Sequence, residues 1–237
     1  MNKLPTMNRK FLSSSGGFSL VEMAIVLAIV ALLMAGLLPT LSGQIEQGRR
    51  TETRKLLDEI QQALVGYAII NGYFPCPTTT ADPAHANYGL ADASCSSPAA
   101  EGYLPWKTLG VAETDAWGVK RSSAGSQWIG YWRYRVEPSF ASGVPFTLTT
   151  TSNTTLNLQV RDNANIAITN TGSMNTPVAI VYSTGPNLTA DGQNSSYEQT
   201  TSAIYQSDTP NSTFDDMTIW ISRPALFSRM VAAGKLP

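Results

Sequence analysis

Few residues in the chain have the types and spacing that support catalysis. His85 is the only histidine among 237 residues, and no Gly-x-Ser-x-Gly turn presents a serine nucleophile to it. There is no phosphate-binding P-loop or dinucleotide-binding glycine motif, and the acidic residues are mostly scattered singly, with Asp215 and Asp216 the only adjacent aspartates. One histidine and two cysteines are too few for a zinc ribbon or an iron–sulfur cluster. The sequence therefore predicts that the protein is not an enzyme.

One charged residue lies in an unusual place. Glu22 is the only charge in the apolar run of residues 18–38, FSLVEMAIVLAIVALLMAGLL. At ~1.5 Å per residue, a helix of this length spans the ~30 Å hydrocarbon core of a bilayer. The apolar part of a secretory signal is shorter, at roughly 7–15 residues. Residues 18–38 are therefore predicted to form a transmembrane helix. A carboxylate deep in such a helix costs about 2.5–3.5 kcal/mol, so we expect Glu22 to have a partner.

The residues around this acid resemble a known family. Gly16-Gly17 followed by Phe18-Ser-Leu-Val-Glu22 is similar to the leader and helix start of type IV prepilins and type II secretion pseudopilins. The resemblance implies that a prepilin peptidase cuts after Gly17 on the cytoplasmic face and then methylates the new amino group of Phe18. Glycine suits this position because it has no side chain to obstruct approach to the scissile carbonyl. The transmembrane helix would stay in the mature protein.

Two partners can be considered for Glu22. The resemblance implies that its carboxylate attracts the new N-terminal ammonium of Phe18 in a neighbouring subunit during assembly. Opposite charges attract strongly in a low dielectric, so this pairing would set the register of the subunits. In the alternative, Glu22 only stabilises the start of its own helix, where the macrodipole favours a negative charge.

The two cysteines follow the predicted end of the long helix. Cys76 and Cys95 lie in a turn-rich, nearly uncharged segment that begins after Asn71-Gly72. The family resemblance places this segment in the periplasm, where disulfides persist. A bridge closing the segment between them would stabilise the fold by about 3 kcal/mol. We therefore expect a Cys76–Cys95 disulfide, with two free buried thiols as the alternative.

The predicted fold class is α+β. Apolar residues three or four apart continue the helical pattern from the membrane to Asn71, with a kink or unwound turn expected at Gly36 and Pro39. Alternating segments rich in Thr, Val and Ile predict antiparallel strands, and a short helix is expected at the end of the chain. The expected strands cover residues 131–136, 146–150, 156–160, 166–169, 178–183 and 217–222, with a long loop over 185–212 and the short helix over 224–234.

These elements predict four consecutive parts of a pilin-like architecture, a long N-terminal helix packed on an antiparallel β-sheet head. The parts are a leader over residues 1–17, a transmembrane helix over 18–38, the periplasmic half of the same helix over 39–71, and an α+β globular head over 72–237.

Two head segments carry a weaker resemblance. Asp115-Ala-Trp117-Gly118 is similar to a pseudopilin motif in which the aspartate ties down a turn and the tryptophan packs between helix and sheet. The tryptophans of this region are expected in the core, with an aromatic platform for carbohydrate or protein as the alternative. These residues are Trp106, Trp117, Trp128 and Trp132.

Calcium is the one cofactor that the sequence suggests. Residues 183–194, together with residues 214–220, resemble the calcium loop of major pseudopilins, although the insert between the two parts is longer. Asn187, Asp191, Asn194 and Asp216, with backbone carbonyls, could supply the six to eight oxygens that calcium requires. A metal-free network of Asx turns is the alternative.

The predicted function is that of a minor pilin or pseudopilin in a type IV pilus or a type II secretion-like filament, at the bacterial inner membrane with its head in the periplasm. Expected partners are the prepilin peptidase, sister pilins, an inner-membrane assembly platform and the lipid bilayer. Cleavage would remove three of the 16 basic residues and none of the 17 acidic ones, leaving a net charge of −4, so nucleic acid is not an expected partner. The alternative is a membrane-anchored periplasmic binding or adhesion module with a pilin-type anchor.

Overall fold

The computed structural model describes residues 17–95, 101–141, 143, 145–152, 158–169, 172, 174–196 and 203–236, with the backbone alone at 35–41, 195 and 196. The predicted leader up to Gly16 lies outside the described residues. The chain divides into two compact units, Met1–Glu46 and Gln47–Pro237. The later part of the long helix therefore belongs to the same unit as the head.

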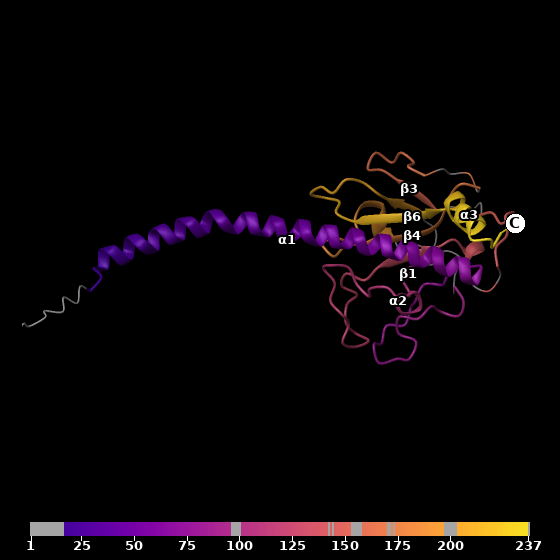
Figure 1. Ribbon diagram of the computed structural model, residues 1–237, viewed down its shortest axis with the longest axis horizontal. Coiled ribbons are helices and arrows are strands. Elements are labelled where there is room, and N and C mark those ends of the chain that lie inside the picture. Colours follow the sequence, from indigo (N-terminus) through magenta and orange to yellow (C-terminus); the bar gives the residue numbers. More distant parts are fainter. Residues whose placement is uncertain are drawn as a thin grey trace, which may run out of the picture. The chain divides into compact units, whose positions relative to one another are not determined.

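Helix α1, Leu20–Asn71, contributes to both units (Figure 1). The helix continues through Gly36 and Pro39, so the predicted unwound turn is absent there. In the first unit its large apolar side chains are exposed, from Leu20 to Met34. Among the residues that the structure describes, no helix meets the combined length and apolarity required to cross a membrane.

Two β-sheets build the head. The larger is antiparallel, in the order β1 (Gly102–Tyr103), β2 (Arg133–Val136), β4 (Pro177–Ser183) and β6 (Met217–Ser222). The smaller pairs β3 (Gln159–Arg161) with β5 (Ile204–Gln206), and this pair is parallel. The short helices are α2 (Trp106–Leu109), η1 (Pro138–Phe140), η2 (Gly192–Ser196) and α3 (Arg223–Ala232).

The main core lies between α1 and one face of the larger sheet. Four buried residues at helical spacing form the stripe that α1 contributes: Leu57, Ile60, Leu64 and Ala68. They pack in one cluster with sheet residues such as Val181 and Ile221, and with Leu226 and Phe227 of α3. Because this stripe occurs only in the later part of α1, that part of the helix is an integral element of the head.

A second core lies on the other face of the sheet. Alternate residues of β4, Ile180 and Tyr182, point away from α1 and pack against Val160 of β3 and Tyr205 of β5. Strand β4 is therefore buried along its whole length, which matches its continuous apolar sequence. The head has three layers: helices, the four-stranded sheet, and the β3–β5 pair.

The predicted architecture agrees with this structure in outline and differs in detail. Strand β6 has the predicted bounds, and β4 and α3 begin one residue early. The predicted strand at 146–150 is wrong, since a turn forms there: the Thr150 N–H donates to the Thr147 carbonyl at 3.0 Å and the Thr147 N–H donates to the Thr150 hydroxyl at 2.9 Å. Strand β5 lies in the segment predicted as a long loop, and its parallel pairing departs from the predicted all-antiparallel head.

The helix–sheet core predicts a large loss of stability for a truncation on the buried stripe. Leu64 is 0% exposed, so Leu64→Ala should lower the free energy of unfolding of the full-length protein in detergent by about 2–5 kcal/mol. Ile70 lies on the same helix but is 76% exposed, so Ile70→Ala should change the free energy of unfolding by less than about 0.5 kcal/mol. Equal effects of the two changes in urea unfolding would contradict this packing of α1.

Candidate functional site

The start of α1 carries a reciprocal hydrogen-bonded cap. The Ser19 backbone N–H donates to Oε2 of Glu22 at 2.8 Å, and the Glu22 N–H donates to the Ser19 hydroxyl at 3.2 Å. This is a capping box, which satisfies two of the free N–H groups at a helix start. Glu22 thus makes the contact with its own helix that the sequence left open as the alternative. A carboxylate accepts about four hydrogen bonds, so this cap leaves capacity for a second partner.

The two residues before the cap have no packing role in the described chain. Phe18 is 84% exposed. A methyl group added at Gly17 would meet nothing within 4 Å, and Gly17 does not have the left-handed conformation that favours glycine. Neither residue type is therefore required by the packing of the described residues.

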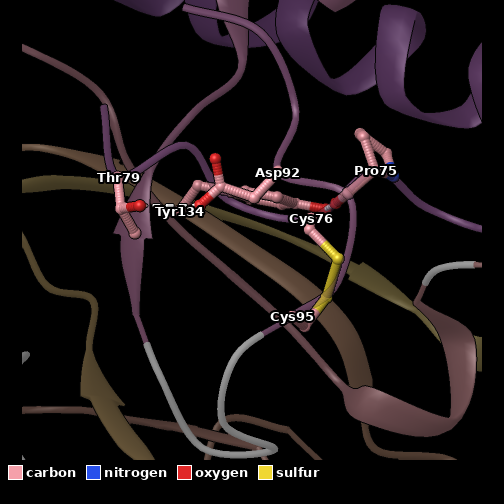
Figure 2. Close-up of a disulfide and its surroundings, with 6 residues drawn as sticks. All are labelled: Pro75, Cys76, Thr79, Asp92, Cys95 and Tyr134. Atoms are coloured by element: carbon pink, nitrogen blue, oxygen red, sulfur yellow. Dashed lines mark hydrogen bonds between the residues drawn. A yellow bond between two sulfur atoms is a disulfide. The ribbon is translucent and has the colours of Figure 1, made fainter. Parts of the chain in front are cut away.

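The structure contains the expected disulfide, between Cys76 and Cys95, with the Cα atoms 5.2 Å apart (Figure 2). Cys76 lies just after α1, and two hydrogen bonds fix its surroundings. The Tyr134 hydroxyl donates to the Pro75 carbonyl at 3.0 Å, and Thr79 donates to Asp92 at 2.7 Å. The bridge therefore fastens a long surface loop to the residues that follow the helix.

Asp115 holds the turn that was predicted for it. Its carboxylate accepts hydrogen bonds from the Trp117 N–H at 2.9 Å and from the Ser183 hydroxyl at 2.6 Å. Burial raises the pKa of Asp115 to about 6, although these hydrogen bonds oppose the rise. Gly130 has φ +66°, and a Cβ there would lie 2.4 Å from Oδ1 of Asp115. With Trp117 in the helix–sheet core, the structural role predicted for this motif is confirmed.

The rings of an aromatic cluster in the head pack against one another. The cluster contains Tyr88, Tyr103, Trp106, Trp128 and Tyr131. Tyr103 and Trp128 stack with ring centroids 3.7 Å apart, so each ring has one face left. Arg121 covers the other face of Trp128 at 4.1 Å, and Arg133 covers that of Tyr103 at 4.4 Å. These rings therefore offer no free face for a sugar. Arg133 is engaged here and Arg135 is only 2% exposed, so the two arginines form no basic strip for nucleic acid.

The predicted calcium ligands come together only in part. Carboxylate oxygens of Asp191, Asp215 and Asp216 lie within 4.8 Å of one another. The amide of Asn194 is instead used within the chain: its oxygen accepts from the Gln206 N–H at 2.8 Å, and its nitrogen donates to Asp216 at 2.9 Å. Asn187 likewise donates to Asp191 and accepts from the Thr189 N–H.

Sequence reasoning missed Asp215 as a member of this group, although Asp215-Asp216 is the only pair of adjacent aspartates in the chain. The two asparagines orient carboxylates, and Asp215 adds an oxygen that the predicted ligand set lacked.

Asp216 is the most constrained of the three acids. It is 2% exposed, and its Oδ2 accepts from the Asp191 N–H and from Asn194. Its Oδ1 has no hydrogen-bond partner within the described residues. Burial raises the pKa of Asp216 to about 7, and the charges of Asp191 and Asp215 add to the rise. A hard divalent cation would supply the missing partner and would neutralise the repulsion, so the three carboxylates fit calcium.

Comparison with known families finds a match at the start of the chain. Residues 12–38 match the prokaryotic N-terminal methylation motif, the signature of type IV pilins, pseudopilins and other prepilin-type proteins. The α+β structure, with its N-terminal helix and antiparallel sheet, is consistent with a pilin-like fold. The signature implies a membrane-anchored protein that prepilin peptidase processes and that assembles with other pilins, which are structural proteins and not enzymes. No curated protein and no solved structure matches the chain.

The disulfide predicts a measurable response to reduction. Non-reducing peptide mapping should recover the Cys76 and Cys95 peptides as one species, and reduction should lower the free energy of unfolding by about 3 kcal/mol. The double variant Cys76→Ser, Cys95→Ser should match the reduced wild type and should not respond to reductant. Free thiols in wild-type protein isolated without reductant would contradict the pairing.

Proposed function

We propose that the protein is a structural subunit, a minor pilin or pseudopilin, of a type IV pilus or a type II secretion-like filament. The match of residues 12–38 to the methylation motif is the observation that carries this proposal. In this reading residues 1–17 are a leader, 18–38 a single transmembrane span, 39–71 the periplasmic half of the helix, and 72–237 the periplasmic head. Cleavage follows Gly17, Phe18 is methylated, and the mature helix packs with those of sister pilins at the inner membrane.

The residues at the cut support this reading. Gly17 and Phe18 are exposed and have no role in the fold, as expected for residues that an enzyme recognises. The first part of α1 also exposes large apolar side chains, from Leu20 to Met34. Lipid tails before assembly, and neighbouring helices after it, would cover them.

The cap at Ser19 and the proposed assembly role of Glu22 are compatible. The Ser19 N–H belongs to the peptide bond with Phe18, so the capping box survives cleavage. The box holds the Glu22 carboxylate at the helix start and leaves part of its acceptor capacity unused. The methylated ammonium of Phe18 in a neighbouring subunit would complete a charge-assisted pair there.

This proposal is tested by substitutions that separate capping from assembly. Glu22→Ala and Glu22→Gln should lower photo-crosslinking of the helix to sister pilins by at least about tenfold, because leaving one charge of a buried pair alone costs about 3–5 kcal/mol. Ser19→Ala removes the cap oxygen but keeps the carboxylate, so it should assemble nearly as well as wild type. If Ser19→Ala and Glu22→Ala impair assembly equally, Glu22 serves its own helix alone.

We also propose that Asp191, Asp215 and Asp216 bind calcium in the head. The proposal is supported by the convergence of three carboxylates and by the buried, unpartnered Oδ1 of Asp216 within the described residues. The ion would fasten the loop after β4 to the residues that lead into β6, since Asp191 lies in that loop and Asp216 directly precedes β6.

Calcium should therefore stabilise the head. At 100 times its dissociation constant a ligand adds about 2.7 kcal/mol, so calcium should raise the melting temperature relative to EDTA, and magnesium should do so less. Asp216→Asn should abolish the rise. Asp208→Asn is the control, because Asp208 is outside the cluster and caps the Asn163 N–H. An equal melting temperature in calcium and EDTA would rule out the site without affecting the pilin assignment.

A further inference from the structure

Glu101 joins the two sheets of the head. It lies directly before β1, at the edge of the larger sheet. Its Oε1 accepts a hydrogen bond from the hydroxyl of Tyr182 on β4 at 2.9 Å, and its Oε2 accepts one from Tyr205 on β5 at 2.5 Å. Strands β4 and β5 belong to different sheets. One carboxyl group is therefore the acceptor for a hydroxyl from each layer.

The charged and titratable groups that face this carboxyl come from three strands, β2, β4 and β5. Arg133 and Arg135 of β2 are close enough to favour its ionised form, and Tyr182 and Tyr205 also favour it by hydrogen bonding. Burial outweighs these four contributions and raises the pKa of Glu101 to about 7. Burial also raises the pKa of Tyr182 and Tyr205 far above their usual range, so both hydroxyls keep their protons throughout the physiological range.

We propose that the Glu101 carboxyl is a proton-sensitive fastening between the β3–β5 layer and the four-stranded sheet, and that the layer opens more readily once this carboxyl loses its proton. In the closed head the ionised group is held away from water, and opening β5 from β4 would hydrate it. Once the carboxyl is protonated, opening no longer gains the hydration free energy of a charged group.

The surroundings can accommodate the protonated form. A neutral carboxyl accepts fewer hydrogen bonds than a carboxylate and needs an acceptor for its own proton. The Tyr182 hydroxyl already lies 3.3 Å from the backbone carbonyl of Asn194, in η2, and can donate there instead. Its oxygen is then free to accept the proton of Glu101. Both protonation states can therefore keep the two layers in contact, with different strengths.

The expected size of the pH effect on opening follows from the linkage between proton binding and stability. An acid whose pKa is raised by folding contributes stability that is present below its ordinary pKa, 4.5, and lost as the pH rises through the folded value, about 7. Between pH 6 and pH 8 the opening constant of the β3–β5 layer should therefore rise about tenfold. Hydrogen exchange of the amides in Gln159–Arg161 and Ile204–Gln206, corrected for the intrinsic pH dependence of exchange, measures this constant in the full-length protein.

The matched variants isolate Glu101. Glu101→Gln keeps the shape but cannot ionise, so the tenfold rise should disappear. Glu113→Gln is the control, because Glu113 also accepts hydroxyls from two tyrosines, Tyr88 and Tyr131, but in the aromatic cluster. It should keep the rise. A rise that persists in Glu101→Gln, or is absent from the wild type, would overturn the proposal.

A second measurement does not depend on any variant folding. Carbon-13 NMR of the wild-type glutamate carboxyls should show Glu101 titrating near pH 7. Titration of Glu101 near its ordinary value would show that the carboxyl is hydrated in the closed head, and the proposal would fail.

Discussion

The packing of one helical stripe against one sheet face is the contact on which the rest of the head depends. Leu57, Ile60, Leu64 and Ala68 of α1 form one cluster with residues of the central sheet and of α3. Removing this helix would expose an apolar sheet face to water, which costs about 25 cal/mol for each Å² of apolar surface exposed. The helix that carries the anchor signature at its start is thus also the helix that completes the head. Any force that assembly places on α1 acts directly on this core.

The parts of this fold that follow from local pattern were predictable. The apolar runs of β4 and β6 and the stripe of α1 have the periods that their structures require. Strand β5 was not predictable, because Ile204–Gln206 is short and its partner, β3, lies more than 40 residues earlier in the chain. The alternating segment 146–150 misled for a different reason. Phe146 does enter the core, but the threonines after it bond to one another and turn the chain.

The candidate sites also divide into features that the local sequence predicts and features that depend on the fold. The Cys76–Cys95 pairing could be expected from two cysteines in an exported loop, and the role of Asp115 from its resemblance to a pseudopilin turn motif. The composition of the acidic cluster could not, because only the fold decides whether an asparagine binds an ion or orients a carboxylate. Asn194 orients Asp216, and Asp215 joins the group. The position of Glu101 between two tyrosines depends on the packing of two sheets, which no local signal reveals.

Cleavage at Gly17 is the event that would turn this chain into an assembly subunit, and the mature N-terminus tests that claim most directly. Mass spectrometry of the N-terminal peptide, from membranes of cells that contain the prepilin peptidase, should show a chain that begins at Phe18 with one methyl group on its nitrogen. The Gly17→Leu variant should keep residues 1–17. A wild-type chain that begins at Met1, or at any residue other than Phe18, would contradict the account.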